Sequence, residues 1–177
     1  MANITDRMIR AARLDVTLYE EVEADKGALS QAMSVVILSS VAAGIGTGLH
    51  GGIGRMVLGA IAALVGWYVW AYITYLIGTK LLPEPQTEAD IGQLLRTTGF
   101  SSSPGLIRVL GFIPGLSGLI LAIANIWMLV AMVIAVRQAL DYHGTLRAVG
   151  VCLIGWVLQA LIAVLLLAVV GGAAVGA

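Results

Sequence analysis

Side chains that could do chemistry are few in this sequence, and they do not form a catalytic set. His50 and His143 are its two histidines, and they fall in loops on opposite sides of the expected membrane spans, so they cannot share a metal ion or a proton relay. Cys152 is the one cysteine and lies in an apolar run, which excludes an intramolecular disulfide and a thiolate cluster. Neither a Ser-His-Asp order, a phosphate-binding glycine loop nor an HExxH pattern is present. We therefore expect no enzymatic activity, no catalytic residue and no metal site.

An aromatic stripe is the best candidate for a contact surface. Tyr68, Tyr72 and Tyr75 recur at helical spacing, and Trp67 and Trp70 lie beside them. Such a stripe is typical of a bundle core or of a contact with a neighbouring subunit, with each hydroxyl bonded to a carbonyl. It could instead line a pocket for a pigment, a quinone or an acyl chain. We expect bound lipid and assign no cofactor, which leaves pigment or quinone contact open.

Arg108 is the one charge that we expect to lie within the membrane. We interpret it as an arginine whose long side chain reaches the outer headgroups; the alternative is that it binds a lipid phosphate or a partner. Asn125 and Gln159 are uncharged polar residues within spans, and we expect each to form hydrogen bonds between helices. Ser102 and Pro104 belong to a kink, because proline removes a backbone donor and serines can satisfy freed carbonyls.

Composition decides the class of protein. Of the 177 residues, 59% are hydrophobic and 11% charged, against about 45–50% and about 25% in soluble domains. Lipid must therefore be the solvent for most of this surface. The formal net charge is zero, which gives no argument for a nucleic-acid partner. The first long apolar run begins near Leu29 behind a charged segment, so we expect a retained span rather than a cleaved signal peptide.

The apolar runs predict an all-α, polytopic membrane bundle with five spans. A cytoplasmic segment, 1–27, precedes a transmembrane domain, 28–177. The predicted spans are 29–49, 56–81, 91–113, 116–136 and 149–170. The span at 91–113 is only moderately apolar and is broken at Ser101 to Pro104. It is included because five spans with a cytoplasmic N-terminus leave an excess of Lys and Arg on the inside. The inside then holds Arg7, Arg10, Arg13, Lys26, Lys80, Arg96, Arg137 and Arg147.

The N-terminal segment predicts one amphipathic helix over about Ile4 to Glu23. Its apolar residues share one arc at 100° per residue, although Asp15 interrupts that arc. Arg7, Arg10 and Arg13 suit the anionic headgroups of a cytoplasmic leaflet. We expect this helix to lie on the membrane surface and to contact anionic lipids through these arginines.

Two stretches give a family resemblance. Leu94 to Pro104 (LLRTTGFSSSP) resembles the opening of the third span in the Yip family of Rab-interacting membrane proteins. Ile126-Trp127, followed by Ala135 to Arg137 and then Leu146 to Ala148, is similar to the family's fourth span and short inner loop. The resemblance implies a non-catalytic membrane protein with its N-terminus in the cytosol. Eukaryotic relatives act in vesicle trafficking and bind prenylated GTPases, but the long N-terminal region and the Asp-Leu-Tyr-Gly-Pro-like motif of those relatives are not found in this sequence.

Three functions follow as alternatives. The first is a structural, accessory or assembly subunit of a larger membrane complex, for which respiratory and photosynthetic assemblies are natural hosts. The second is a small transporter or channel that uses the broken third span, and the third is a membrane-shaping or trafficking-type protein that uses the amphipathic helix. The short loops favour a bacterial cytoplasmic (inner) membrane. Expected partners are membrane lipids and other integral membrane subunits.

Overall fold

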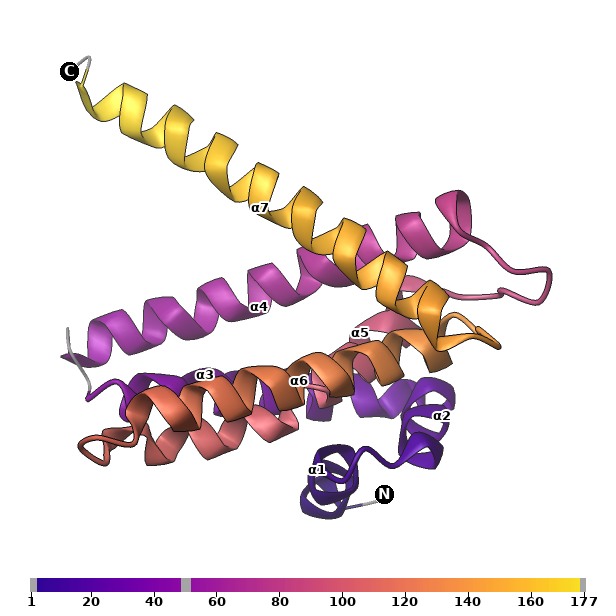
Figure 1. Cartoon of the computed structure of the whole chain (residues 1–177), viewed down its shortest axis with the longest axis horizontal. Coiled ribbons are helices and arrows are strands. Elements are labelled where there is room, and N and C mark those ends of the chain that lie inside the picture. Colours follow the sequence, from indigo (N-terminus) through magenta and orange to yellow (C-terminus); the bar gives the residue numbers. More distant parts are fainter. Residues whose placement is uncertain (1–2, 49–51, 176–177) are drawn as a thin grey trace.

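The computed structural model describes residues 3–48 and 52–175, and every regular element in these ranges is helical. His50 and the predicted end of the first span at Leu49 lie outside the described residues. Figure 1 shows long helices side by side, with two short N-terminal helices packed across one end. The elements are α1 (Ile4–Ala12), α2 (Val16–Ala24), η1 (Lys26–Ala28), α3 (Leu29–Gly46), α4 (Gly52–Leu76), η2 (Ile77–Leu81), α5 (Ile91–Phe100), η3 (Ser103–Phe112), α6 (Ser117–Ala139) and α7 (Thr145–Val175).

The N-terminal segment forms two helices, so the prediction of one continuous amphipathic helix is wrong. Leu14 has a φ of 61°, a left-handed conformation that ends a helix. Asp15 then caps α2, since its carboxylate accepts from the Thr17 backbone N–H at 3.0 Å. The aspartate that interrupted the apolar arc is therefore the residue that starts the second helix. Asn3 caps α1 in the same way.

Four helices are long and apolar enough to cross a membrane. They are Lys26–Gly46, Gly52–Leu81, Ser117–Ala139 and Thr145–Leu165. Each overlaps one of the predicted spans. Only 17% to 33% of each of these spans is buried, and large apolar side chains such as Leu58 and Leu119 are exposed, which suits helices surrounded by hydrocarbon rather than water. The described residues thus include four candidate spans, and the predicted count of five is not confirmed.

The segment expected to be the third span consists of two shorter helices. The 10-residue α5 ends at Phe100, and the 10-residue 3₁₀ helix η3 begins at Ser103. Pro104 occupies the first turn of η3, where its missing N–H costs no hydrogen bond. The predicted break at the serines is confirmed, but neither half has the length of a span.

This broken segment runs through the bundle from one end to the other. At its start, the Arg96 guanidinium donates to the carbonyls of Val22 and Glu23. At its far end, Gly111 packs against Gly46, the last residue of α3. Every residue from Leu94 to Phe100 is buried, so α5 forms part of the core between α3, α4 and α6. We call the end at Glu23 the N-terminal end of the bundle, and the end at Gly46 the distal end.

Polar contacts fix the loops at the N-terminal end. The Tyr142 hydroxyl, after α6, lies 3.1 and 2.8 Å from the carbonyl oxygens of Gly78 and Leu82, toward which it donates. Arg147 at the start of α7 donates to the Pro83 carbonyl at 2.7 Å. These bonds connect the ends of α4, α6 and α7. The helices can therefore diverge toward the distal end, as α4 and α7 do in Figure 1.

Candidate functional site

A groove of about 570 Å³ lies between α3, α4, α5, η3, α6 and α7. The α4 wall is a helical stripe that contains small residues, among them Gly52, Gly59 and Gly66. Because these positions carry no side chain, α4 leaves open space beside α3 and α6. The opposite wall combines hydroxyl groups from α3 and α5 with methionine side chains from α6. We call this space the α4 groove.

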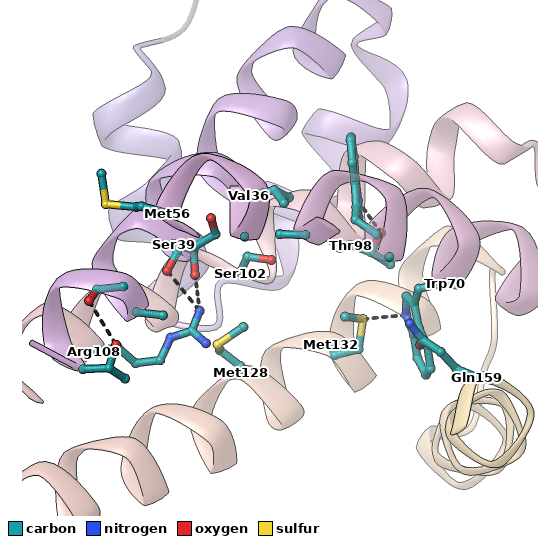
Figure 2. Close-up of a pocket in the computed structure, with 18 of the residues that line it drawn as sticks. Val36, Ser39, Met56, Trp70, Thr98, Ser102, Arg108, Met128, Met132 and Gln159 are labelled. Carbon is teal, nitrogen blue, oxygen red and sulfur yellow. Dashed lines mark hydrogen bonds between the residues drawn. The ribbon is translucent and has the colours of Figure 1, made fainter. Parts of the chain in front are cut away.

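Arg108 lies at the distal end of the α4 groove. Its Nε donates to the Gly105 carbonyl at 3.0 Å, and its Nη2 donates to the Ser39 hydroxyl at 2.7 Å and to the Ser39 carbonyl at 3.2 Å. The side chain therefore points along the groove toward α3, as Figure 2 shows. The prediction that it extends outward to the headgroups is wrong. Its three bonds go to neutral groups and leave its positive charge without a counter-charge.

The charges that line the groove have a single sign. Among the described residues that line it, Arg55 and Arg108 are the charged ones, and these residues include neither aspartate nor glutamate. Ser40 adds a hydroxyl that is buried without a hydrogen-bond partner, and Ser102 and Thr98 add two more hydroxyls along the same wall. The distal end of the groove is thus cationic and rich in hydrogen-bonding groups.

The other end of the groove is aromatic and contains the Met132 side chain. Trp70 is buried, and its indole N–H faces the Met132 sulfur at 3.1 Å. Trp67 donates to the Thr98 hydroxyl at 3.2 Å. Figure 2 shows Arg108 and Ser39 at one end of the groove and Trp70 and Met132 at the other. Flexible methionines and flat indoles suit an apolar, adaptable ligand.

The predicted aromatic stripe divides between two faces of α4. Trp67 and Trp70 line the groove, whereas Tyr68 and Tyr72 are 55% and 45% exposed on the outside of the helix. Tyr75 is partly buried and packs against the core that includes Leu140 and Ile77. The stripe is therefore neither a single pocket nor a single contact surface.

The remaining predicted polar residues have different outcomes. Gln159 and Ser102 line the groove, and Pro104 is buried at the start of η3. Asn125 is exposed on α6, so it does not join helices inside the bundle as expected. Sequence reasoning missed Ser39, Ser40 and the methionines of the groove. The only signal for them was the pair of adjacent serines in an otherwise apolar span.

The N-terminal arginines bind protein groups rather than projecting together toward a membrane surface. Arg7 is buried and pairs with Glu21 at 2.9 Å and Asp25 at 2.8 Å, and it also donates to Gln31. Arg10 pairs with Glu21 at 2.6 Å. For these two residues the expected role as anionic-lipid contacts is corrected, because carboxylates already occupy their guanidinium groups. Arg13 is exposed, and its predicted lipid contact stays a prediction.

A second, polar cavity of about 720 Å³ lies at the N-terminal end, between α2, α5 and the loop after α6. Glu23 and Asp141 both face it. Burial raises the pKa of Glu23 to about 7, and the nearby Asp141 carboxylate adds to this shift. Gln93 donates to the Glu23 carboxyl group at 3.0 Å. The cavity therefore holds a carboxyl group that is half protonated near neutral pH.

This shift predicts that the chain becomes less stable as the pH rises. In the unfolded chain Glu23 titrates near its ordinary 4.5 and in the folded chain near 7. Between these values the folded state binds more protons, so the free energy of unfolding falls with rising pH. We expect the unfolding temperature in detergent to fall from about pH 5 to about pH 8, and Glu23→Gln to reduce this slope. An unchanged slope in the variant would assign the dependence to another group.

Four apolar helices of spanning length, joined by short loops and packed around a buried broken segment, make this chain a polytopic integral membrane protein. Residues 19–167 match the Yip1 domain, and the chain belongs to the Yip1 family. The resemblance seen around Leu94 to Pro104 is thereby confirmed. Neither the curated proteins nor the solved structures gave a match.

Proposed function

We propose that this Yip1-family chain is a non-catalytic accessory or assembly subunit of a larger membrane complex. The exposed face of α4 around Tyr68 and Tyr72 would contact a neighbouring integral membrane subunit. We call this the tyrosine face. In this proposal the host membrane is the bacterial cytoplasmic membrane, with the N-terminal end of the bundle on the cytoplasmic side.

The position of the two exposed tyrosines carries the proposal. Tyr68 lies 16 residues after Gly52 in the candidate span Gly52–Leu81, which places it about 24 Å along the helix axis. Both hydroxyls therefore lie near the middle of the span and face outward. Hydrocarbon offers no hydrogen-bond partner, and an unpaired hydroxyl there is costly. A neighbouring subunit that supplies an acceptor removes this cost and covers the rings.

The path of α5 and η3 supports two parts of this proposal. One is that the N-terminal end of the bundle faces the cytoplasm, and the other is that α5 and η3 together cross the membrane a fifth time. The segment connects the N-terminal end with the distal end, so α4 and α6 both finish on the side of α1 and α2. On this path we assign eight of the ten basic residues to the side of α1 and α2. The excess suits a cytoplasmic face. Arg55 and Arg108 remain toward the distal end.

The experiment is a pull-down of the tagged chain from its native membranes in mild detergent. We expect integral membrane subunits to co-purify in fixed ratio. Tyr68→Ala together with Tyr72→Ala should reduce their recovery about tenfold, equivalent to about 1.4 kcal/mol of binding free energy. Leu119→Ala with Ile126→Ala, on the exposed face of α6, is the matched control and should retain them. Recovery of the wild-type chain with lipid alone would refute the accessory role.

The other two functions stay predictions. Transport along the broken segment would appear as substrate flux in liposomes that contain the purified chain. Membrane shaping would appear as tubulation that requires Met8 and Val16. Met8 packs against the core formed by Leu18, Tyr19 and neighbouring residues, so its side chain is directed to protein rather than to a membrane surface.

A further inference from the structure

The α4 groove holds two positive charges in a part of the chain that lies among apolar spans. Arg108 is half-buried and donates its hydrogen bonds to Gly105 and Ser39, which carry no charge. Arg55 lines the same groove nearer the start of α4. The Arg108 guanidinium bonds only to neutral groups in these contacts, and in a region of low dielectric a bound anion offsets the cost of such a charge.

The site has hydrogen-bond donors that an anionic ligand with oxygen atoms could accept from. The three bonds of Arg108 use Nε and Nη2, so Nη1 takes no part in them. The Ser40 hydroxyl on the same wall is buried and has no partner. Guanidinium groups and hydroxyls together are the donors that phosphate oxygens accept from.

The rest of the groove has the chemistry of an acyl-chain site. From Arg55 its wall follows α4 to Trp70, a distance of about 22 Å at 1.5 Å per residue. This exceeds the depth of one leaflet, about half of the roughly 30 Å hydrocarbon core. Met132 and the indole of Trp70 line the inner part, whereas Met128 lies beside Arg108. The polar end is thus near the distal face and the apolar end is deep, which is the polarity of a lipid in that leaflet.

We propose that the α4 groove binds an anionic phospholipid, with its phosphate at Arg108 and Arg55 and one acyl chain along α4 toward Trp70. A membrane lipid suits the groove better than a free phosphate ion, because the cationic end continues into a long apolar channel. The site is separate from the tyrosine face, which points away from the groove.

The test uses the tryptophans of the groove as reporters. Trp67, Trp70 and Trp156 line it, and bromine atoms on an acyl chain quench indole fluorescence only at close range. The full-length chain, delipidated in a neutral detergent, is titrated with brominated phosphatidylglycerol or brominated phosphatidylcholine. We expect half-maximal quenching at an about tenfold lower mole fraction of the anionic lipid. Equal quenching by the two lipids overturns the proposal, and so does displacement of the anionic lipid by inorganic phosphate alone.

Variants locate the site. Arg108→Gln should abolish the preference for the anionic lipid, while Arg147→Gln at the N-terminal end should keep it. A preference that persists in a folded Arg108→Gln chain overturns the proposal.

A second pair of variants tests the groove without touching Arg108. A side chain at Gly59 meets open space in the groove, and one at Gly54 meets open space outside it. Gly59→Leu should therefore weaken quenching by the anionic lipid, whereas Gly54→Leu should leave it unchanged. Equal behaviour of the two leucine variants would place the lipid elsewhere.

Discussion

Gly46→Val is expected to separate η3 from α3 and to cause a large loss of stability. Gly46 is the last residue of α3, and a Cβ atom built on it overlaps the carbonyl oxygen of Arg108 and lies 3.5 Å from the Gly111 Cα. The obstacle is backbone, so a side-chain rotation cannot relieve it. Overpacking costs up to about 3 kcal/mol even where side chains can move, and we expect at least that cost here. The Arg108 side chain should lose its position beside Ser39 at the same time.

The measurement is thermal unfolding of the purified chain in a mild detergent. Gly54→Val is the matched control, because both glycines lie in helices and a Cβ at Gly54 meets no atom within 4 Å. The two variants share the change in helix propensity from glycine to a β-branched residue, which is less than about 1 kcal/mol. The difference between them therefore reports the contact with η3. Equal unfolding temperatures would mean that α3 and η3 do not approach this closely in the membrane protein.

The spans could be predicted from the sequence because the rule behind them is local. A run of about 20 apolar residues has to be helical in hydrocarbon, whatever its neighbours are. The break at Pro104 follows in the same way from the missing backbone donor. The segment 91–113 could not be assigned from such a rule. Its α5 half is buried by surrounding helices, so its low hydropathy reports contact with protein rather than contact with water.

The N-terminal segment shows why amphipathicity alone is insufficient. The same apolar arc can lie on lipid or on a protein surface. In this chain Ala11, Leu18, Tyr19 and Val22 form a core cluster with residues of α3, α5 and α6. Asp15 was the available signal, since an acidic residue in an apolar arc is a sign of a cap rather than of a continuous helix.

The groove depends on side chains from six helices and could not be derived from any one of them. The spacing of Tyr68, Tyr72, Trp67 and Trp70 indicated a helix with aromatic faces but did not show which face is inside. That choice is made by Thr98 and Met132, which accept the indole N–H groups, and both are remote in sequence. The same holds for Arg108, whose direction is set by Ser39, 69 residues earlier.

Arg7→Gln is expected to release α1 and α2 from the bundle without unfolding the spans. The Arg7 side chain is 4% exposed, while its carboxylate partners Glu21 and Asp25 are 35% and 43% exposed. Because water can solvate the carboxylates after the change, we expect a loss of about 2 kcal/mol, below the range for a fully buried pair. Hydrogen exchange should then become faster over residues 4–24 and stay unchanged in α6. Lys26→Gln, an exposed change of the same charge, is the control.

The pH dependence of this opening identifies its cause. Arg10 first and Arg7 second lower the pKa of Glu21, and Arg7 lowers that of Asp25. A carboxyl group with a lowered pKa stabilises the fold above its ordinary value near 4, and this contribution is lost as the pH falls through the folded pKa. In the wild-type chain the protection of residues 4–24 against exchange, measured relative to the intrinsic rate at each pH, should therefore fall on acidification below about pH 4, and Arg7→Gln should weaken that response. A variant that opens the segment but keeps the full acid response would show that the packing of Tyr19 and Leu18, rather than the ion pairs, holds the N-terminal helices on the bundle.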